Sequence, residues 1–317
     1  MALDLWALAI LLSKLIAYIS FASLTGGFFV IYLNDTQNAR NLNSGVLSYS
    51  NSSSFEQRLL PFLLSSSVLG LVCVLLFFLL QVGAINQNGI PGMFDWLMTT
   101  IVLQSAVGTG VGLKAASFVL FIGLTLVMLA SHKRKSAPPI KGLNSFAAVL
   151  AIAIALACAG FSEMGHVVSL GVLEQFALAL HVLAIALWVG SFYPLYLLCR
   201  TEQGVRVLPL MKRFGDWGWA ITLSLSIAGG YLLTQLLSSP IELISTSYGV
   251  LMLIKVLCVL CLLGLAALNK FRLVPALSVA GTQALARSIK GEMCLAAVVL
   301  ILTALLSTVT GPDHLMG

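Results

Sequence analysis

The stretch LALHVLAIALWVGSFYPLYLL, Leu178 to Leu198, carries one histidine, His181, in an almost entirely apolar run. An α-helix rises about 1.5 Å per residue, so this run is about 30 Å long, which is the thickness of the hydrocarbon core of a bilayer. The stretch is therefore predicted to be a transmembrane helix. An apolar side chain would have a lower free energy of insertion into lipid than an imidazole. An ionisable ring at this place is therefore a candidate functional group.

The rest of the chain repeats this apolar pattern. The 317 residues are 59% apolar and only 9% charged, and the mean hydropathy is +1.03, which excludes a soluble protein of this size. Membrane spans without strand-like alternation must be helices, because lipid offers the backbone no hydrogen bonds. We therefore predict one all-α integral membrane domain over residues 1–317, a polytopic transmembrane helix bundle of about eight spans: Leu5–Leu33, Leu59–Ile85, Gly110–Ala130, Leu143–Phe161, Leu173–Cys199, Trp217–Leu237, Tyr248–Val274 and Ile289–Thr308.

Residues Asp95–Gln104 form a further apolar stretch. It is too short to cross the bilayer, so it is expected to lie at the membrane interface or to re-enter the membrane.

The basic residues fix a predicted orientation. Three lysines lie in the outer halves of spans, and the remaining 14 of the 17 Lys and Arg residues all fall in the loops after the first, third, fifth and seventh spans or in the last few span residues beside those loops. Basic loops stay in the cytoplasm, so both termini are predicted to lie outside. The same asymmetry accounts for the net charge of +6, and no nucleic-acid partner is expected.

The outer loops and termini have a different composition. They combine carboxylates, imidazoles and thioethers, a set that suits copper, with thioether favouring Cu(I). The candidate metal ligands there are Glu163, Met164, His166 and His314. The alternative is that methionine is simply common at membrane interfaces.

His181 is expected about 12 Å inside the fifth span, eight residues from its outer end. Trp188 follows on nearly the same face, and Ala186 with Gly190 forms a small-xxx-small pair that would let another helix approach closely. Pro194 is expected to loosen or kink the inner part of the helix. His181 is thus predicted to face a packed interior, either as a metal ligand or as a neutral ring hydrogen-bonded to a neighbouring helix.

Three spans contain a lysine in their outer halves: Lys14, Lys114 and Lys255. An intramembrane lysine costs about 3 kcal/mol on insertion scales, so three at similar depth indicate a common polar cavity open to the outside. Glu174 and Glu163 are available as partners. Snorkelling of each lysine to the interface is the alternative.

The cysteines give a weaker indication. All six lie in or at the ends of spans, which argues against a disulfide framework. Cys258 and Cys261 form a CxxC inside a predicted helix, which makes them weak Cu(I) candidates, since buried free cysteine is often just a small apolar residue.

An ordered set of residues in the second half resembles the copper resistance D (CopD-like) family of bacterial inner-membrane proteins. The resemblance covers about residues 95–310. It rests on Gly165-His166, on His181 with Trp188, Gly190 and Pro194-Leu195, on Arg213-Phe214-Gly215, on Leu253-Ile254-Lys255, on Asn269 to Leu273-Val274-Pro275, on Lys290 with Glu292, and, in the first half, on Val102-Leu103-Gln104 and the glycines before Lys114.

The resemblance implies a membrane protein that brings copper from the periplasm into the cytoplasm, alongside a periplasmic copper-binding protein of the copper resistance C type. The chain departs from the family in two places. Leu178 stands where relatives can carry a further histidine, and Tyr18 follows Lys14 where they can carry another. Fewer ligands predict weaker metal binding.

The expected function is therefore copper import across the bacterial inner membrane by a multi-pass protein that is not an enzyme, with copper as cargo or ligand, lipid as surroundings and no organic cofactor. Outer Met164, His166, Glu163 and His314 would capture the ion and pass it to His181. Two alternatives remain open: a membrane haem or porphyrin redox protein, for which two facing histidines would be usual, and a non-transporting membrane partner of a periplasmic copper protein.

Overall fold

The computed structural model describes residues 5–43, 54–133, 143–163, 171–237, 239–277 and 281–307, and these residues form helices and no strands. Eight helical segments in this part of the chain are long and apolar enough to cross a membrane. The predicted all-α polytopic bundle is confirmed, and the protein is a multi-pass membrane protein.

Each predicted span coincides with an observed helix or helix pair. The fifth span is divided into two helices, and the seventh ends in a π-helical turn. The elements are α1 (Leu5–Asn43), α2 (Ser54–Asn86), α3 (Gly89–Gly92), α4 (Trp96–Leu103), α5 (Ala106–Lys133), α6 (Leu143–Ser162), α7 (Val172–Val189), α8 (Phe192–Thr201), α9 (Gly204–Leu236), α10 (Glu242–Ser245), α11 (Ser247–Leu268), η3 (Asn269–Leu273) and α13 (Gln283–Leu306).

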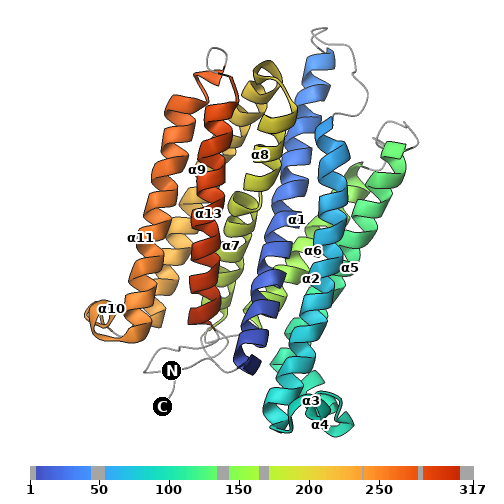
Figure 1. Ribbon diagram of the computed structural model, residues 1–317, viewed down its shortest axis with the longest axis vertical. Coiled ribbons are helices and arrows are strands. Elements are labelled where there is room, and N and C mark those ends of the chain that lie inside the picture. The colour runs from blue at the N-terminus through green and yellow to red at the C-terminus, as the bar shows by residue number, and fades with distance from the viewer. Residues whose placement is uncertain are drawn as a thin grey trace.

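The long helix α1 lies in the middle of the bundle (Figure 1). On one side it packs against α2, which in turn contacts α5, and α5 contacts α6. On the other side α1 contacts α7, α8, α9 and α13, and α11 packs on α13 beyond them. Leu24, Val30 and Leu33 point in different directions around α1 and are all fully buried, as expected for a helix with neighbours on both sides.

The two ends of the bundle differ in sequence. Helix α1 begins and α13 ends at the same end as the short helices α3, α4 and α10 (Figure 1). The opposite end, where α1, α5 and α8 end and α2, α9 and α13 begin, is the end of the basic loops, and we call it the basic end. An even number of spans puts both chain ends on one side, as the charge pattern predicts.

Helix α9 starts 13 residues before the predicted span at Trp217. Its 33 residues correspond to about 50 Å, well beyond the bilayer core. The extra turns carry Arg206, Lys212 and Arg213, which the charge pattern had assigned to a loop. They continue as helix despite Pro209, with Val207, Leu210 and Met211 buried against the bundle.

The short apolar stretch Asp95–Gln104 does not cross the bundle. The Asp95 carboxylate accepts a hydrogen bond from the Met98 amide at 2.8 Å and so caps the start of α4. Helix α4 lies at the end of the bundle against α2 and α5 (Figure 1). Trp96 and Leu97 are largely exposed, which fits the expected location at the membrane interface.

Candidate functional site

His181 lies on the face of α7 that packs against α9. A Cβ placed on Gly229 of α9 would lie 2.8 Å from Cε1 and 3.1 Å from Nδ1 of the His181 ring. The imidazole therefore rests directly on the α9 backbone, at a place where only glycine leaves room for it. The ring faces a neighbouring helix, as the sequence predicted.

One ring nitrogen of His181 is left without a polar contact. The ring lies by the main-chain carbonyl of Leu225, one turn before Gly229. Nδ1 is buried and has no hydrogen-bond partner among the described residues. An imidazole with a bare ring nitrogen is the form in which histidine binds metals.

Lys255 of α11 is the charged group within electrostatic reach of this ring. Lys255 belongs to a third helix, α11, beside the α7 and α9 helices that contact at the ring. A lysine ammonium repels a cation bound at Nδ1. The site thus combines one good ligand with one unfavourable charge.

The close approach predicted for the Ala186–Gly190 pair is present. A Cβ on Gly190 would lie 1.7 Å from the Ala22 carbonyl oxygen of α1, and one on Gly26 would lie 2.1 Å from the Gly190 carbonyl carbon. The backbones of α1 and the fifth span are in direct contact here. Trp188, 4% exposed, packs edge-on against Phe192, with ring centroids 6.0 Å apart. It is a core residue beside this crossing.

The fifth span is interrupted at the same crossing. Helix α7 ends at Val189 and α8 begins at Phe192. Pro194 has no amide hydrogen to donate to the carbonyl of Gly190, and its ring would clash with that carbonyl in a continuous helix. The break occurs where the proline removes the bond, which confirms the predicted effect of Pro194.

The three lysines occupy two places and not one. Lys14 and Lys114 line a single small cavity of about 20 Å³, together with Ala17, Tyr18, Val74, Phe77 and Phe161. A cavity of this size holds about one water molecule. Lys255 is not among its lining residues and lies by His181 instead. Two of the three lysines therefore share a small cavity, and a polar cavity common to all three stays a prediction.

Each lysine of the cavity has an identified contact. Lys14 Nζ donates a hydrogen bond of 2.9 Å to the carbonyl oxygen of Ser307, at the C-terminal end of α13. A cation is favourable at that end of a helix dipole. Lys114, 7% exposed, places Nζ 5.0 Å from the centroid of the Phe161 ring and 5.9 Å from that of Phe77. These contacts account for the burial of both side chains.

The predicted outer ligands are placed only in part. Met164, His166 and His314 lie outside the described residues. Glu163 is half-buried at the end of α6. The Glu174 carboxylate accepts a hydrogen bond from the Tyr231 hydroxyl at 2.6 Å, so the partner observed for it is a tyrosine of α9. Among the described residues no three His, Cys, Asp or Glu side chains converge on a possible metal position.

Cys258 and Cys261 lie on α11 with different exposure. Cys258 is partly buried against the core, whereas Cys261 is exposed. They lie about one turn apart on adjoining parts of the helix surface, and neither belongs to a three-ligand group within the described chain.

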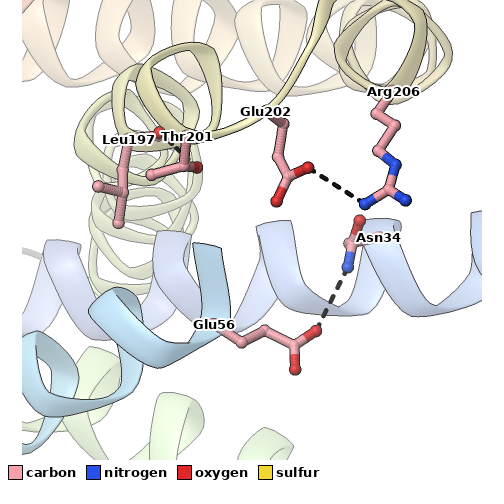
Figure 2. Close-up of polar contacts among 6 residues, drawn as sticks. All are labelled: Asn34, Glu56, Leu197, Thr201, Glu202 and Arg206. Atoms are coloured by element: carbon pink, nitrogen blue, oxygen red, sulfur yellow. Dashed lines mark hydrogen bonds and ion pairs between the residues drawn. The ribbon is translucent and has the colours of Figure 1, made fainter. Parts of the chain in front are cut away.

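A polar cluster at the basic end was missed by sequence reasoning. The Asn34 amide donates to Glu56 Oε1 at 3.4 Å, and Glu202 pairs with Arg206 at 3.3 Å one helical turn away (Figure 2). His132 Nδ1 lies 3.7 Å from Glu56 Oε2, with side chains only 18% and 21% exposed. Helix α2 thus brings a carboxylate to His132, which stands beside three basic residues in the sequence.

Comparison with known proteins agrees with the resemblance read from the residues. Residues 208–306 match the family model described as "Copper resistance protein D". No curated protein and no solved structure matches the chain. The matched part includes Leu225, Gly229 and Lys255, so it supplies the surroundings of His181, which itself lies before it. Over residues 208–306 the chain is therefore similar to the copper resistance protein D family.

Proposed function

We propose that this membrane protein carries copper from the periplasm to the cytoplasm through the bacterial inner membrane, and that His181 binds the ion on its way. The observation that carries the proposal is the bare, buried Nδ1 of His181. A buried polar atom without a partner requires an explanation, and an ion that binds there transiently supplies one. The CopD-like surroundings of the ring favour copper as this ion.

The His181 environment fits a site through which an ion passes. A conducting site must bind well enough to admit the ion and weakly enough to release it. One imidazole supplies the binding, and the nearby charge of Lys255 opposes a stable complex. A resident metal centre would need several convergent ligands.

In this proposal copper is first captured outside the membrane. Met164, His166, Glu163 and His314 carry the thioether, imidazole and carboxylate groups that suit copper. A periplasmic copper-binding protein of the copper resistance C type is the proposed donor to this surface. The ion then reaches Nδ1 of His181, about a third of the way into the membrane.

Total copper in a bacterial host with a defined copper permeability tests this function. Cells would carry empty vector, wild type, His181→Ala, His166→Ala or His132→Ala, with membrane levels matched by immunoblot. His132→Ala is the control, because His132 pairs with Glu56 at the basic end. We expect wild type and His132→Ala to raise cell copper, and the other two variants to match the vector.

Two results would contradict the proposal in different ways. If wild-type cells contain less copper than cells with the empty vector, the protein exports copper and the proposed direction is wrong. If cell copper is the same in both, the protein transports nothing by itself and acts as a membrane partner. A visible absorption spectrum of the purified protein would then test for bound haem.

A further inference from the structure

A buried carboxyl group lies in the half of the membrane opposite His181. Glu292 of α13 is 3% exposed. It is the tenth residue of α13, which begins at the basic end, so it lies about 14 Å along the helix. Intramembrane carboxyl groups are costly and are the usual carriers of protons in membrane proteins.

The observed partner of Glu292 is neutral. The Asn269 side-chain amide donates a hydrogen bond of 2.9 Å to Glu292 Oε2, and both residues are buried. A buried carboxylate needs a compensating positive charge or several donors. One amide donor falls short of that requirement, which favours a proton on Glu292 in the resting protein.

The charged groups on the surrounding elements do not supply the missing compensation. Helix α13 packs against α1, α8, α11 and η3. Among the described residues, the hydrogen bond observed at the carboxyl group comes from the Asn269 amide, and neither observed ion pair includes Glu292. The titratable side chains that these elements carry are Lys14, Tyr18, Tyr32 and Asp35 on α1, Tyr193, Tyr196, Cys199 and Arg200 on α8, Tyr248, Lys255, Cys258 and Cys261 on α11, Lys270 and Arg272 on η3, and Arg287, Lys290 and Cys294 on α13.

Asn269 is suited to hold the group in either protonation state. Its amide presents a donor and an acceptor. Nδ2 bonds the carboxylate, and Oδ1 is buried without a partner among the described residues. If the amide turns over, Oδ1 accepts a hydrogen bond from the protonated acid, so the pair stays satisfied.

The backbone at Asn269 is irregular. Asn269 opens the π-helical turn η3, in which the Val274 amide reaches back to the Asn269 carbonyl at 2.8 Å. Such turns are rare and occur frequently at functional sites. One turn nearer the basic end than Glu292, the buried Ser288 hydroxyl also lacks a partner in the described chain. Since residues four apart share a helix face, Ser288 is the next polar group toward the cytoplasm.

We propose that Glu292 is a reversible proton-binding site, that Asn269 positions its carboxyl group, and that the proton exchanges with cytoplasmic water past Ser288. The carboxyl O–H bond forms as a proton leaves that water and breaks as the proton returns. On the proposed function above, this proton is the ion coupled to copper movement. The site lies in the inner half of the membrane, away from the His181 ring in the outer half.

Infrared difference spectroscopy of the purified protein in lipid nanodiscs, scanned over pH, tests the site directly. We expect a band of a protonated carboxyl group that is lost on titration, is absent from Glu292→Gln and persists in the control Glu202→Gln at the basic end. Asn269→Ala keeps the acid, and we expect its midpoint to shift by about one pH unit, the effect of one hydrogen bond. The Asn269→Ala variant provides the test of the proton site if the Glu292→Gln variant does not fold.

An unchanged band in Glu292→Gln, or an unchanged midpoint in Asn269→Ala, overturns the proton site. A band that responds to sodium at constant pH overturns it in favour of a metal cation. Copper uptake into proteoliposomes under an imposed pH gradient tests the coupling, and we expect gradient dependence in wild type but not in Glu292→Gln. Absence of wild-type uptake rejects the proposed function and the coupling together, while the infrared band decides the proton site by itself.

Discussion

At the scale of residues, the account depends on which atoms of His181 are engaged. Nδ1 is buried and has no hydrogen-bond partner within the described chain. The sequence placed a histidine at this depth and toward the interior, but it could not name Gly229 as the contact. That contact depends on how α7 and α9 are rotated against each other, which no spacing within α7 specifies.

Gly229→Ala tests this arrangement. The new Cβ would lie 2.8 Å from the His181 ring, so the imidazole must move. We expect copper uptake to fall by about tenfold, the usual effect of disturbing the support of a metal ligand. The matched control is Gly230→Ala, because a Cβ on Gly230 meets nothing within 4 Å. Equal uptake by the two variants would show that the ring position is irrelevant.

At the scale of elements, the eight spans were predictable and their junctions were less so. Hydrophobic length alone identifies each span, since about 20 apolar residues are needed to cross the bilayer. Pro194 indicated the division of the fifth span. The start of α9 at Gly204 was missed, because its first turns pack beyond the membrane with a basic outer face. The lysines were separated into two places by helix packing that the sequence does not encode locally.

The crossing of α1 with the fifth span predicts a strong stability effect. In Gly190→Ala the added Cβ would overlap the Ala22 carbonyl, and both contacting groups are backbone. We expect a loss of about 3 kcal/mol or more, the upper range for overpacking. Thermal unfolding in detergent micelles measures it, with Gly112→Ala as the control, since a Cβ there meets nothing within 4 Å. Matching transitions in the two variants would contradict the close approach.

At the scale of the whole molecule, the helices form two groups joined through α1 and through the contacts of α6 with α7 and of α2 with α8. The Lys14–Lys114 cavity lies in the group of α1, α2, α5 and α6, whereas His181 and the Glu292–Asn269 pair lie in the group of α7 to α13. The second group contains the CopD-like residues 208–306. The copper binding that we propose for His181 therefore belongs to that group.

The orientation of the bundle is a prediction at this scale. A phosphatase that is active only in the periplasm, fused after the last residue, is expected to be active, because the basic loops hold the opposite end in the cytoplasm. The same enzyme inserted between Ser136 and Ala137, in the basic loop after the third span, is expected to be inactive. The reverse pattern would invert the route proposed for copper.

The most direct test of the central claim is copper flux into proteoliposomes that contain only the purified chain. Wild type and His181→Ala would be reconstituted at equal protein density, and trapped copper would be measured by mass spectrometry. The account predicts flux for wild type and a loss of about tenfold or more for the variant, since a ligand on the path is removed. Equal flux through both proteins would contradict the assignment of His181 to the copper path.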